Sequence, residues 1–205
     1  TALERLLPAE ILGLAPGQQR YSQLLADDGG ILDDLMVTRP AQPSRAGLLS
    51  LVLNAARKEE DVAYIRARLP GNVRIEPRFG EALLALQGPA AAAILAEHAP
   101  AAAARRFMTA EVMEVADVTC HVARSGYTGE DGYEIALPAA QAHRLWSLLA
   151  EDARVQPIGL GARDSLRLEA GLPLYGHDID ETTSPVEARL GWSIQRRRRE
   201  VGGFP

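Results

Sequence analysis

Cysteine is nearly absent from this chain of 205 residues. The single residue, Cys120, excludes an internal disulfide and any metal cluster built from several thiolates. It stands in a segment where apolar and polar residues alternate, so we expect it to point into a core as a small apolar side chain. Such sparse use of cysteine is typical of a reducing compartment, and we expect a cytoplasmic protein.

Basic residues are also in short supply. The chain has 22 Lys and Arg against 27 Asp and Glu, a formal net charge of -5. Because nucleic-acid binding requires a surplus of cations to neutralise phosphates, this balance argues against a dedicated nucleic-acid binder. The one basic run, Arg196 to Arg199, is followed at once by Glu200, and we expect it to be the solvated end of an element.

Long apolar runs and several common catalytic motifs are missing as well. No run reaches the roughly 18–20 residues that span a bilayer, so we predict no membrane segment. The four histidines show no metal-ligand spacing, and no metal site is expected. There is no dinucleotide-binding glycine fingerprint, phosphate loop or nucleophile elbow. The chain starts without methionine and ends in Gly-Gly-Phe-Pro, so we expect its natural termini elsewhere.

What the sequence does contain is a mixture of hairpins and amphipathic helices. Two β-rich arms, Arg20–Leu25 and Ile31–Thr38, flank an Asp-Asp-Gly-Gly turn. Apolar residues recur at helical spacing over Glu59–Leu69, and a further helix is expected over Leu160–Glu169. The segment from Glu111 to Arg124 is expected to be extended.

Hairpin-type turns outnumber the long crossovers that a parallel sheet requires, which predicts an α+β fold with antiparallel sheets and flanking helices. We find no linker between domains. The chain is therefore expected to form one domain over residues 1–205, with the alternative of two interlocked lobes at about 1–80 and 81–205.

Three segments carry candidate chemistry. Asp33 and Asp34 are adjacent carboxylates within an apolar strand, where neighbours point to opposite faces, so only one of them can face a given pocket. Glu134 lies inside an apolar strand, where its carboxylate suits a ring with adjacent N–H donors. Arg163 and Arg167 share one face of a helix and imply an acidic or ligand partner. For the Asp33–Asp34 pair and for the two arginines, a purely structural role remains the alternative.

Taken together, six segments in register resemble the T-protein family of the glycine cleavage system, the tetrahydrofolate-dependent aminomethyltransferases. The resemblance runs from about Tyr21 to Arg199 and rests on GGILDDLMVTRP, LVLNAARKEEDV, ALLALQGPAA, RSGYTGEDGYEI, GLGARDSLRLEAGLPLYGHDID and TTSPVEARLGW. It implies a three-lobed α+β protein around a central folate site. The C-terminal β-barrel lobe and the extreme N-terminal strand of that fold are expected to lie outside this chain.

The resemblance also implies an enzyme. An aminomethyl group on the lipoyl arm of the H-protein would pass to tetrahydrofolate, the co-substrate, with release of ammonia and formation of 5,10-methylenetetrahydrofolate. Proximity between the folate nitrogens and the methylene carbon would supply much of the rate. The implied partners are the lipoylated H-protein and the small-molecule folate, with neither nucleic acid nor membrane.

Carried over position by position, the resemblance assigns one catalytic residue and five folate-binding residues. Asp34 resembles the family's key aspartate, beside folate N5 and N10. The folate-binding residues are Tyr21, Asn54, Tyr127, Glu134 and Arg163. The resemblance expects Asp34, Glu134 and Arg163 to border one pterin site.

Two alternatives remain open at this point. One is the folate lobe of a sarcosine or dimethylglycine oxidase, which would show an upstream dinucleotide fingerprint. The other is a non-enzymatic folate-binding accessory protein, whose relatives carry a cysteine motif near a glycine-rich turn, whereas Cys120 stands in a strand-like segment.

Overall fold

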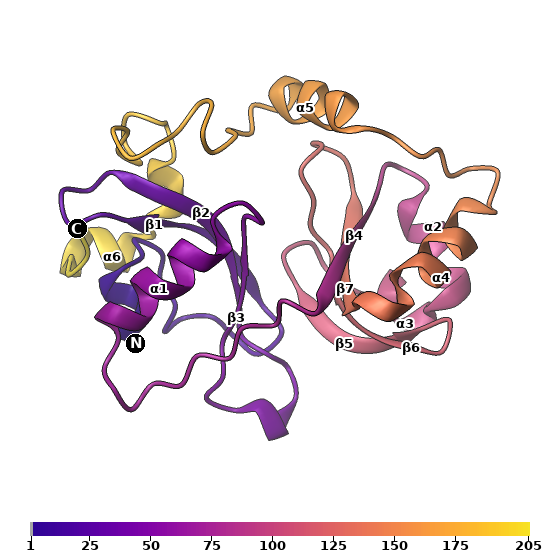
Figure 1. Ribbon diagram of the computed structural model, residues 1–205, viewed down its shortest axis with the longest axis horizontal. Coiled ribbons are helices and arrows are strands. Elements are labelled where there is room, and N and C mark those ends of the chain that lie inside the picture. The colour runs from indigo at the N-terminus through magenta and orange to yellow at the C-terminus, as the bar shows by residue number, and fades with distance from the viewer. Residues whose placement is uncertain (1) are drawn as a thin grey trace. The chain divides into compact units, whose positions relative to one another are not determined.

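The chain forms two compact units, whose elements are labelled in Figure 1, and the computed structural model describes residues 2–205. Unit 1 combines the chain up to Pro77 with Pro173–Pro205, and unit 2 is the continuous segment Arg78–Leu172. The expected second lobe ran to the end of the chain, but the segment from Pro173 onward packs with unit 1. That both units serve one folate-binding domain stays a prediction.

Unit 1 is built on a three-stranded antiparallel sheet in the order β1–β2–β3. The strands are β1 (Gln19–Leu25), β2 (Ile31–Thr38) and β3 (Ser50–Leu53), so the expected hairpin is confirmed. The turn between β1 and β2 requires glycine for a steric reason. A Cβ on Gly30 would lie 1.9 Å from the backbone oxygen of Glu181, which packs against the turn.

Short helical segments flank this sheet in unit 1. They are η1 (Ala2–Arg5), η2 (Pro43–Arg45), α1 (Lys58–Arg68), η3 (Gly191–Ser193) and α6 (Arg196–Val201). Helix α1 confirms the helix that the spacing of apolar residues predicts over Glu59–Leu69. A core containing Leu7, Ile11, Leu24 and Val37, all 0% exposed, lies under the sheet.

The basic run at the end of unit 1 is only partly solvated: Arg196 and Arg199 are exposed as expected, whereas Arg197 and Arg198 correct the sequence-based expectation. Arg197 forms ion pairs with Glu4 and Glu10, both at 2.6 Å. Arg198 is 3% exposed and donates to the backbone oxygens of Glu4 and Leu7. Both guanidinium groups therefore tie the C-terminal segment to the N-terminal one. Their hydrogen bonds to carboxylates and backbone carbonyls come from residues far away in the sequence, which the local run of arginines does not reveal.

Unit 2 contains a four-stranded antiparallel sheet in the order β4–β7–β6–β5. Its strands are β4 (Glu81–Gln87), β5 (Ala110–Val115), β6 (Val118–Ala123) and β7 (Gly132–Pro138). The segment expected to be extended is a hairpin, and its two-residue turn is Ala116–Asp117. Both residues have positive φ, 48° and 62°, as this tight hairpin turn demands.

Three helices, α2 (Ala91–His98), α3 (Pro100–Ala103) and α4 (Ala139–Ala150), lie together beside this sheet in Figure 1. Tyr133 and Ile135 of β7, both 0% exposed, point into the core that the helices cover. Cys120 shares this core and is 1% exposed, which confirms the prediction for its side chain. Burial, followed by the charge of Glu114, raises the pKa of the Cys120 thiol to about 11.

The last helix of unit 2, α5 (Leu160–Glu169), begins and ends where the sequence predicts. Strands paired only in antiparallel fashion within each sheet, together with these helices, confirm the α+β class. Across residues 2–205, the structure contains no helix that is both long and apolar enough to cross a membrane.

Candidate functional site

The adjacent acids of β2 face opposite ways, as strand alternation requires. Asp33 is 0% exposed and belongs to the same face as Ile31 and Leu35, which points into the core. Asp34 is half-buried on the other face. Of the two, only Asp34 is partly exposed; its assignment to a ligand site stays a prediction.

Two predicted folate-binding residues hold the Asp34 carboxylate. The Tyr21 hydroxyl donates to Asp34 Oδ2 at 2.9 Å, and the Asn54 side-chain amide donates to Asp34 Oδ1 at 2.7 Å. Strand register explains both contacts. Tyr21 pairs with Met36, two positions along the same face of β2, while Asn54 directly follows the β3 residue that pairs with Leu35.

The pKa of Asp34 is raised above its usual range. Desolvation by burial is the largest cause, and the nearby charge of Asp33 adds to it. The hydrogen bonds from Tyr21 and Asn54 act in the opposite direction. A carboxyl whose pKa moves toward neutrality suits proton transfer near physiological pH.

An aromatic pair stands beside this carboxylate. The Trp192 ring stacks on Tyr21 with centroids 5.5 Å apart and an interplanar angle of 22°. Trp192, in η3, remains 61% exposed, so its ring offers a flat apolar surface to a ligand. Sequence analysis missed Trp192 as a site residue, although the tryptophan closes the TTSPVEARLGW segment that carries the resemblance.

In unit 2, Glu134 projects from β7 on the face opposite the helical core. Its carboxylate accepts a hydrogen bond from the Ser125 hydroxyl at 2.6 Å. Gln87 braces the adjoining loop by donating to the backbone oxygens of Ser125 and Tyr133, both at 3.1 Å. One oxygen of a carboxylate held in this way stays available for further donors.

Arg163 and Tyr127, also in unit 2, lie in contact with each other. The Arg163 guanidinium carbon lies 4.8 Å from the centre of the Tyr127 ring, a cation–π contact. The loop that carries Tyr127 meets α5 closely, because a Cβ on Gly129 would lie 2.7 Å from the Cβ of Ala170. Within residues 2–205, no ion pair joins Arg163 to Glu134.

The two arginines of α5 differ in their partners. Arg167 is 4% exposed, and its Nε donates to Asp164 Oδ1 at 2.7 Å, so the structural reading holds for this residue. Arg163 forms no ion pair with an acid in the described part of the chain. Its guanidinium therefore remains the one on this helix face that suits an anionic or carbonyl-bearing ligand.

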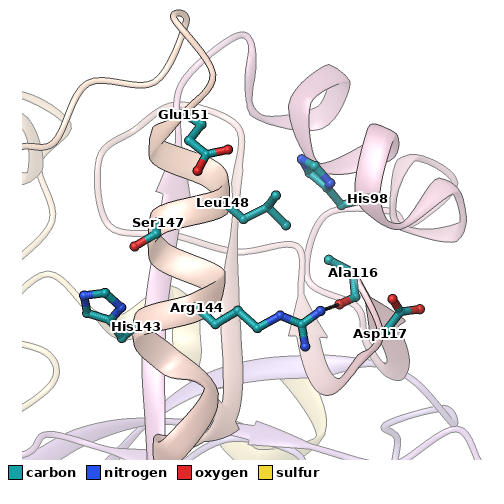
Figure 2. A pocket seen from close by; sticks show the side chains of 8 residues that line it. All are labelled: His98, Ala116, Asp117, His143, Arg144, Ser147, Leu148 and Glu151. Atoms are coloured by element: carbon teal, nitrogen blue, oxygen red, sulfur yellow. Dashed lines mark hydrogen bonds between the residues drawn. The ribbon is translucent and has the colours of Figure 1, made fainter.

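A shallow pocket of unit 2 lies apart from these residues. Figure 2 shows Arg144 reaching from α4 toward the β5–β6 turn, where its Nη2 donates to the Ala116 oxygen at 3.1 Å. The lining also includes His98, Asp117 and His143. None of the predicted site residues lines this pocket, and its arginine already has a structural partner.

The structure thus assembles the predicted residues as two clusters, each within one unit. Tyr21, Asp34 and Asn54 form the acidic cluster of unit 1. Tyr127 and Arg163 form a cation–π pair in unit 2. Glu134 belongs to β7, one of the two paired strands that flank the loop carrying Tyr127. Among residues 2–205, no group of three or more histidine, cysteine or acidic side chains is arranged to hold a metal ion.

Comparison with known proteins identifies relatives over nearly the whole chain. The family model described as GCVT N-terminal domain matches residues 1–198. The chain is 46% identical to the mitochondrial aminomethyltransferase of Canis lupus familiaris, over 99% of this chain and 51% of that protein. It is 45% identical to the aminomethyltransferase of Xylella fastidiosa strain M12, over 94% of this chain and 53% of that protein.

A solved structure shows the same similarity. The crystal structure of glycine cleavage system aminomethyltransferase T from Bartonella henselae aligns with a TM-score of 0.87 and 43% identity. The alignment covers 99% of this chain and 54% of that one. The chain therefore spans about half the length of the relatives that it matches.

Proposed function

Because the chain belongs to the GCVT N-terminal domain family, we propose that it is the folate-binding part of an aminomethyltransferase of the glycine cleavage system. The reaction takes the methylene group from an aminomethylated lipoyl arm of the H-protein to tetrahydrofolate. The products are 5,10-methylenetetrahydrofolate, ammonia and the dihydrolipoyl H-protein. The lipoylated H-protein and tetrahydrofolate are thus the partners that we assign, and the process is glycine catabolism feeding one-carbon metabolism.

The observation that carries this proposal is the Asp34 carboxyl, half-buried, with a raised pKa, and held by Tyr21 and Asn54 beside an exposed aromatic ring. Tetrahydrofolate supplies two ring-closing nitrogens, N5 and N10. As both nitrogens form bonds to the methylene carbon, they release two protons, which the leaving thiolate and the leaving amine take up. Asp34 would orient N5 and N10 and relay a proton between these groups.

The remaining residues fit recognition of the pterin ring. Glu134 offers a carboxylate acceptor to adjacent ring N–H donors, the arrangement that a carboxylate pairs with best. The Arg163–Tyr127 pair presents a guanidinium that is held over an aromatic ring by a cation–π contact. Tyr21 and Trp192 present apolar faces for a flat ring. We assign Asp34 to catalysis and Tyr21, Asn54, Tyr127, Glu134 and Arg163 to folate binding.

We further propose a cytoplasmic location on the strength of the single buried cysteine. The relative from Canis lupus familiaris is named as mitochondrial. Neither alternative function has a supporting observation here, because the similar proteins described above are named aminomethyltransferases.

Calorimetric titration with tetrahydrofolate, alongside an ammonia-release assay with aminomethylated H-protein, tests the assignment. We expect Asp34→Asn to retain binding within about tenfold and to lose turnover by roughly 100-fold or more, since proton transfer is impaired. Glu134→Gln is expected to weaken binding by about 10- to 100-fold through loss of charged hydrogen bonds. Asp27→Asn, an exposed acid of the β1–β2 turn, is the control and should change neither.

Full turnover by Asp34→Asn would remove the assigned mechanism. Failure of the unaltered protein to bind tetrahydrofolate would remove the proposed function as a whole.

A further inference from the structure

A second pair of acids lies beneath Asp34 and has no part in the proposed chemistry. Asp33 comes from the core face of β2 and is 0% exposed. Asp61 comes from the first turn of α1 and is 1% exposed. Besides burial, a hydrogen bond to Asp33 is among the causes that raise the pKa of Asp61, so the two carboxyl groups lie together. Two carboxylates in contact away from water cannot both stay ionised, so one of the two acids keeps its proton.

Asn54 connects this buried pair to Asp34. Its side-chain nitrogen lies 2.8 Å from Asp33 Oδ1 and 2.7 Å from Asp34 Oδ1. Because an amide nitrogen carries two hydrogens, each carboxylate can receive one of them. The backbone N–H of Asn54 also donates to Asp33 Oδ2, at 3.2 Å. Asp33 thus grips Asn54 at two points, and the amide has only one orientation that satisfies both acids.

The proton of the pair belongs on Asp61. Asp33 already accepts two hydrogen bonds from Asn54, one on each carboxylate oxygen, so both of its oxygens act as acceptors. Asp61 Oδ2 is buried and finds no hydrogen-bond donor in the described part of the chain. Burial, followed by the hydrogen bond and the charge of Asp33, raises the pKa of Asp61 to about 8. At neutral pH Asp61 is therefore a donor to Asp33.

The charged groups around the pair leave this arrangement intact. At the N-terminal end of α1, the charge of Arg57, which precedes the helix, lowers the pKa of Asp61, and the Glu60 charge raises it. Arg57 contacts Glu181 at 3.5 Å and the Tyr175 ring at 5.6 Å, and no ion pair joins it to Asp61 among residues 2–205. Burial raises the pKa of Tyr175, in the segment after Pro173, and the charges of Asp33 and Asp61 add to this shift. No cation therefore takes the place of the shared proton.

We propose that Asp33 and Asp61 share one proton and that this pair positions Asn54, and through it Asp34, for the reaction. Asp61 is thus a positioning residue, and this role rests on the proposed function of Asp34. Ionisation of the pair would place two repelling carboxylates behind Asn54 and loosen its grip on Asp34. The positioning should then fail as pH rises through the range near 8, where Asp61 loses its proton.

The first test follows the pair itself and needs no folate. In the unaltered chain, the carboxyl ¹³C signals of the pair should titrate with an apparent midpoint near pH 8, and the Asn54 side-chain N–H signals should shift with the same midpoint. Asp61→Asn replaces the proton donor by an amide N–H that cannot ionise, so the Asn54 signals should stay unchanged across this range. An Asn54 signal that ignores the titration, or a pair that titrates wholly below pH 5, would overturn the inference.

The second test measures turnover against pH in the ammonia-release assay. Asp61→Ala should lower kcat by roughly tenfold with KM for tetrahydrofolate within about threefold, because orientation is lost while binding groups remain. Asp61→Asn should restore kcat at pH 7 and keep it above pH 8, where that of the unaltered protein falls. Glu59→Gln, an exposed acid of the same helical turn, is the matched control.

These outcomes separate the two proposals. If the unaltered protein neither binds tetrahydrofolate nor turns over, the proposed function fails, whereas the titration of the pair can still be observed. If turnover is present but Asp61→Asn retains the fall at alkaline pH, the positioning role fails and the proposed function stands.

Discussion

Replacement of Glu4 by Gln should destabilise unit 1 in a way that depends on pH. Glu4 is 4% exposed and accepts hydrogen bonds from the backbone N–H groups of Ile11 and Leu12, at 2.7 and 2.9 Å. Arg197 donates to the same carboxylate at 2.6 Å. Burial alone would raise the pKa of Glu4, but these hydrogen bonds outweigh it and lower the pKa from 4.5 to about 2.

The expected magnitude follows from that difference in pKa. The shift from 4.5 to about 2 corresponds to roughly 3 kcal/mol at about 1.36 kcal/mol per unit. The Arg197 side chain is 33% exposed, so solvent screens part of this interaction, and we expect about 2 kcal/mol. Because the folded-state pKa is depressed, the stabilisation is complete above pH 4.5 and disappears as pH falls through about 2.

The measurement is urea unfolding, followed by tryptophan fluorescence, of the unaltered chain and of Glu4→Gln. Both proteins carry Trp146→Phe, so that Trp192 alone reports on unit 1. Glu4→Gln should lower the free energy of unfolding by about 2 kcal/mol at pH 7 and by less than about 1 kcal/mol at pH 3. Glu76→Gln, whose side chain is 63% exposed, is the control. An equal loss at the two pH values would refute the reasoning, because the effect would then not come from the charge.

Two further predictions concern unit 2. Gly129→Ala should lower its free energy of unfolding by about 1–3 kcal/mol more than Gly171→Ala does. Both glycines have positive φ, 78° and 72°, but only at Gly129 would the new methyl meet Ala170; equal losses in urea unfolding would contradict the clash. Cys120, with its pKa near 11, should react with a thiol reagent at pH 8 at least about 100-fold slower in the folded chain than in denaturant. Comparable rates would show that the thiol is accessible.

The parts of the fold that the sequence predicted are those decided by neighbours in the chain. The first hairpin follows from β-rich arms around a Gly-Gly turn, and the opposite orientations of Asp33 and Asp34 follow from strand alternation alone. Helix α5 was bounded correctly because Gly171 and Pro173 stop it. These are local rules, and they hold whatever the rest of the chain does.

The parts that the sequence did not predict depend on contacts between distant segments. The Ala116–Asp117 turn lacks the glycine that usually marks a two-residue hairpin, so its strands were read as one extended segment. Arg198 was expected in solvent, and only the arrival of Glu4 from the other end of the chain makes its burial favourable. The same limit applies to the site.

Within the site, residue types indicated the acids and the arginine but not their supports. The stacking of Trp192 on Tyr21 depends on the packing of the segment after Pro173 with the rest of unit 1, which no local sequence pattern predicts. Asp61 looked like one more acid in the first turn of a helix, where acids are common. The positioning role proposed for Asp61 depends on its buried contact with Asp33, and no spacing rule connects the two residues.

The discontinuous chain path of unit 1 has a consequence for the order of events during synthesis. Unit 2 is one uninterrupted stretch, so all of its strands have been synthesised before the segment from Pro173 is made. Unit 1 must wait, because bonds such as the one that Ser193 donates to Gln23, at 2.9 Å and 170 positions apart, need its final segment. Until then, Glu4 and the stacking face of Tyr21 stay open to water or chaperones, and unit 2 can reach its native state first.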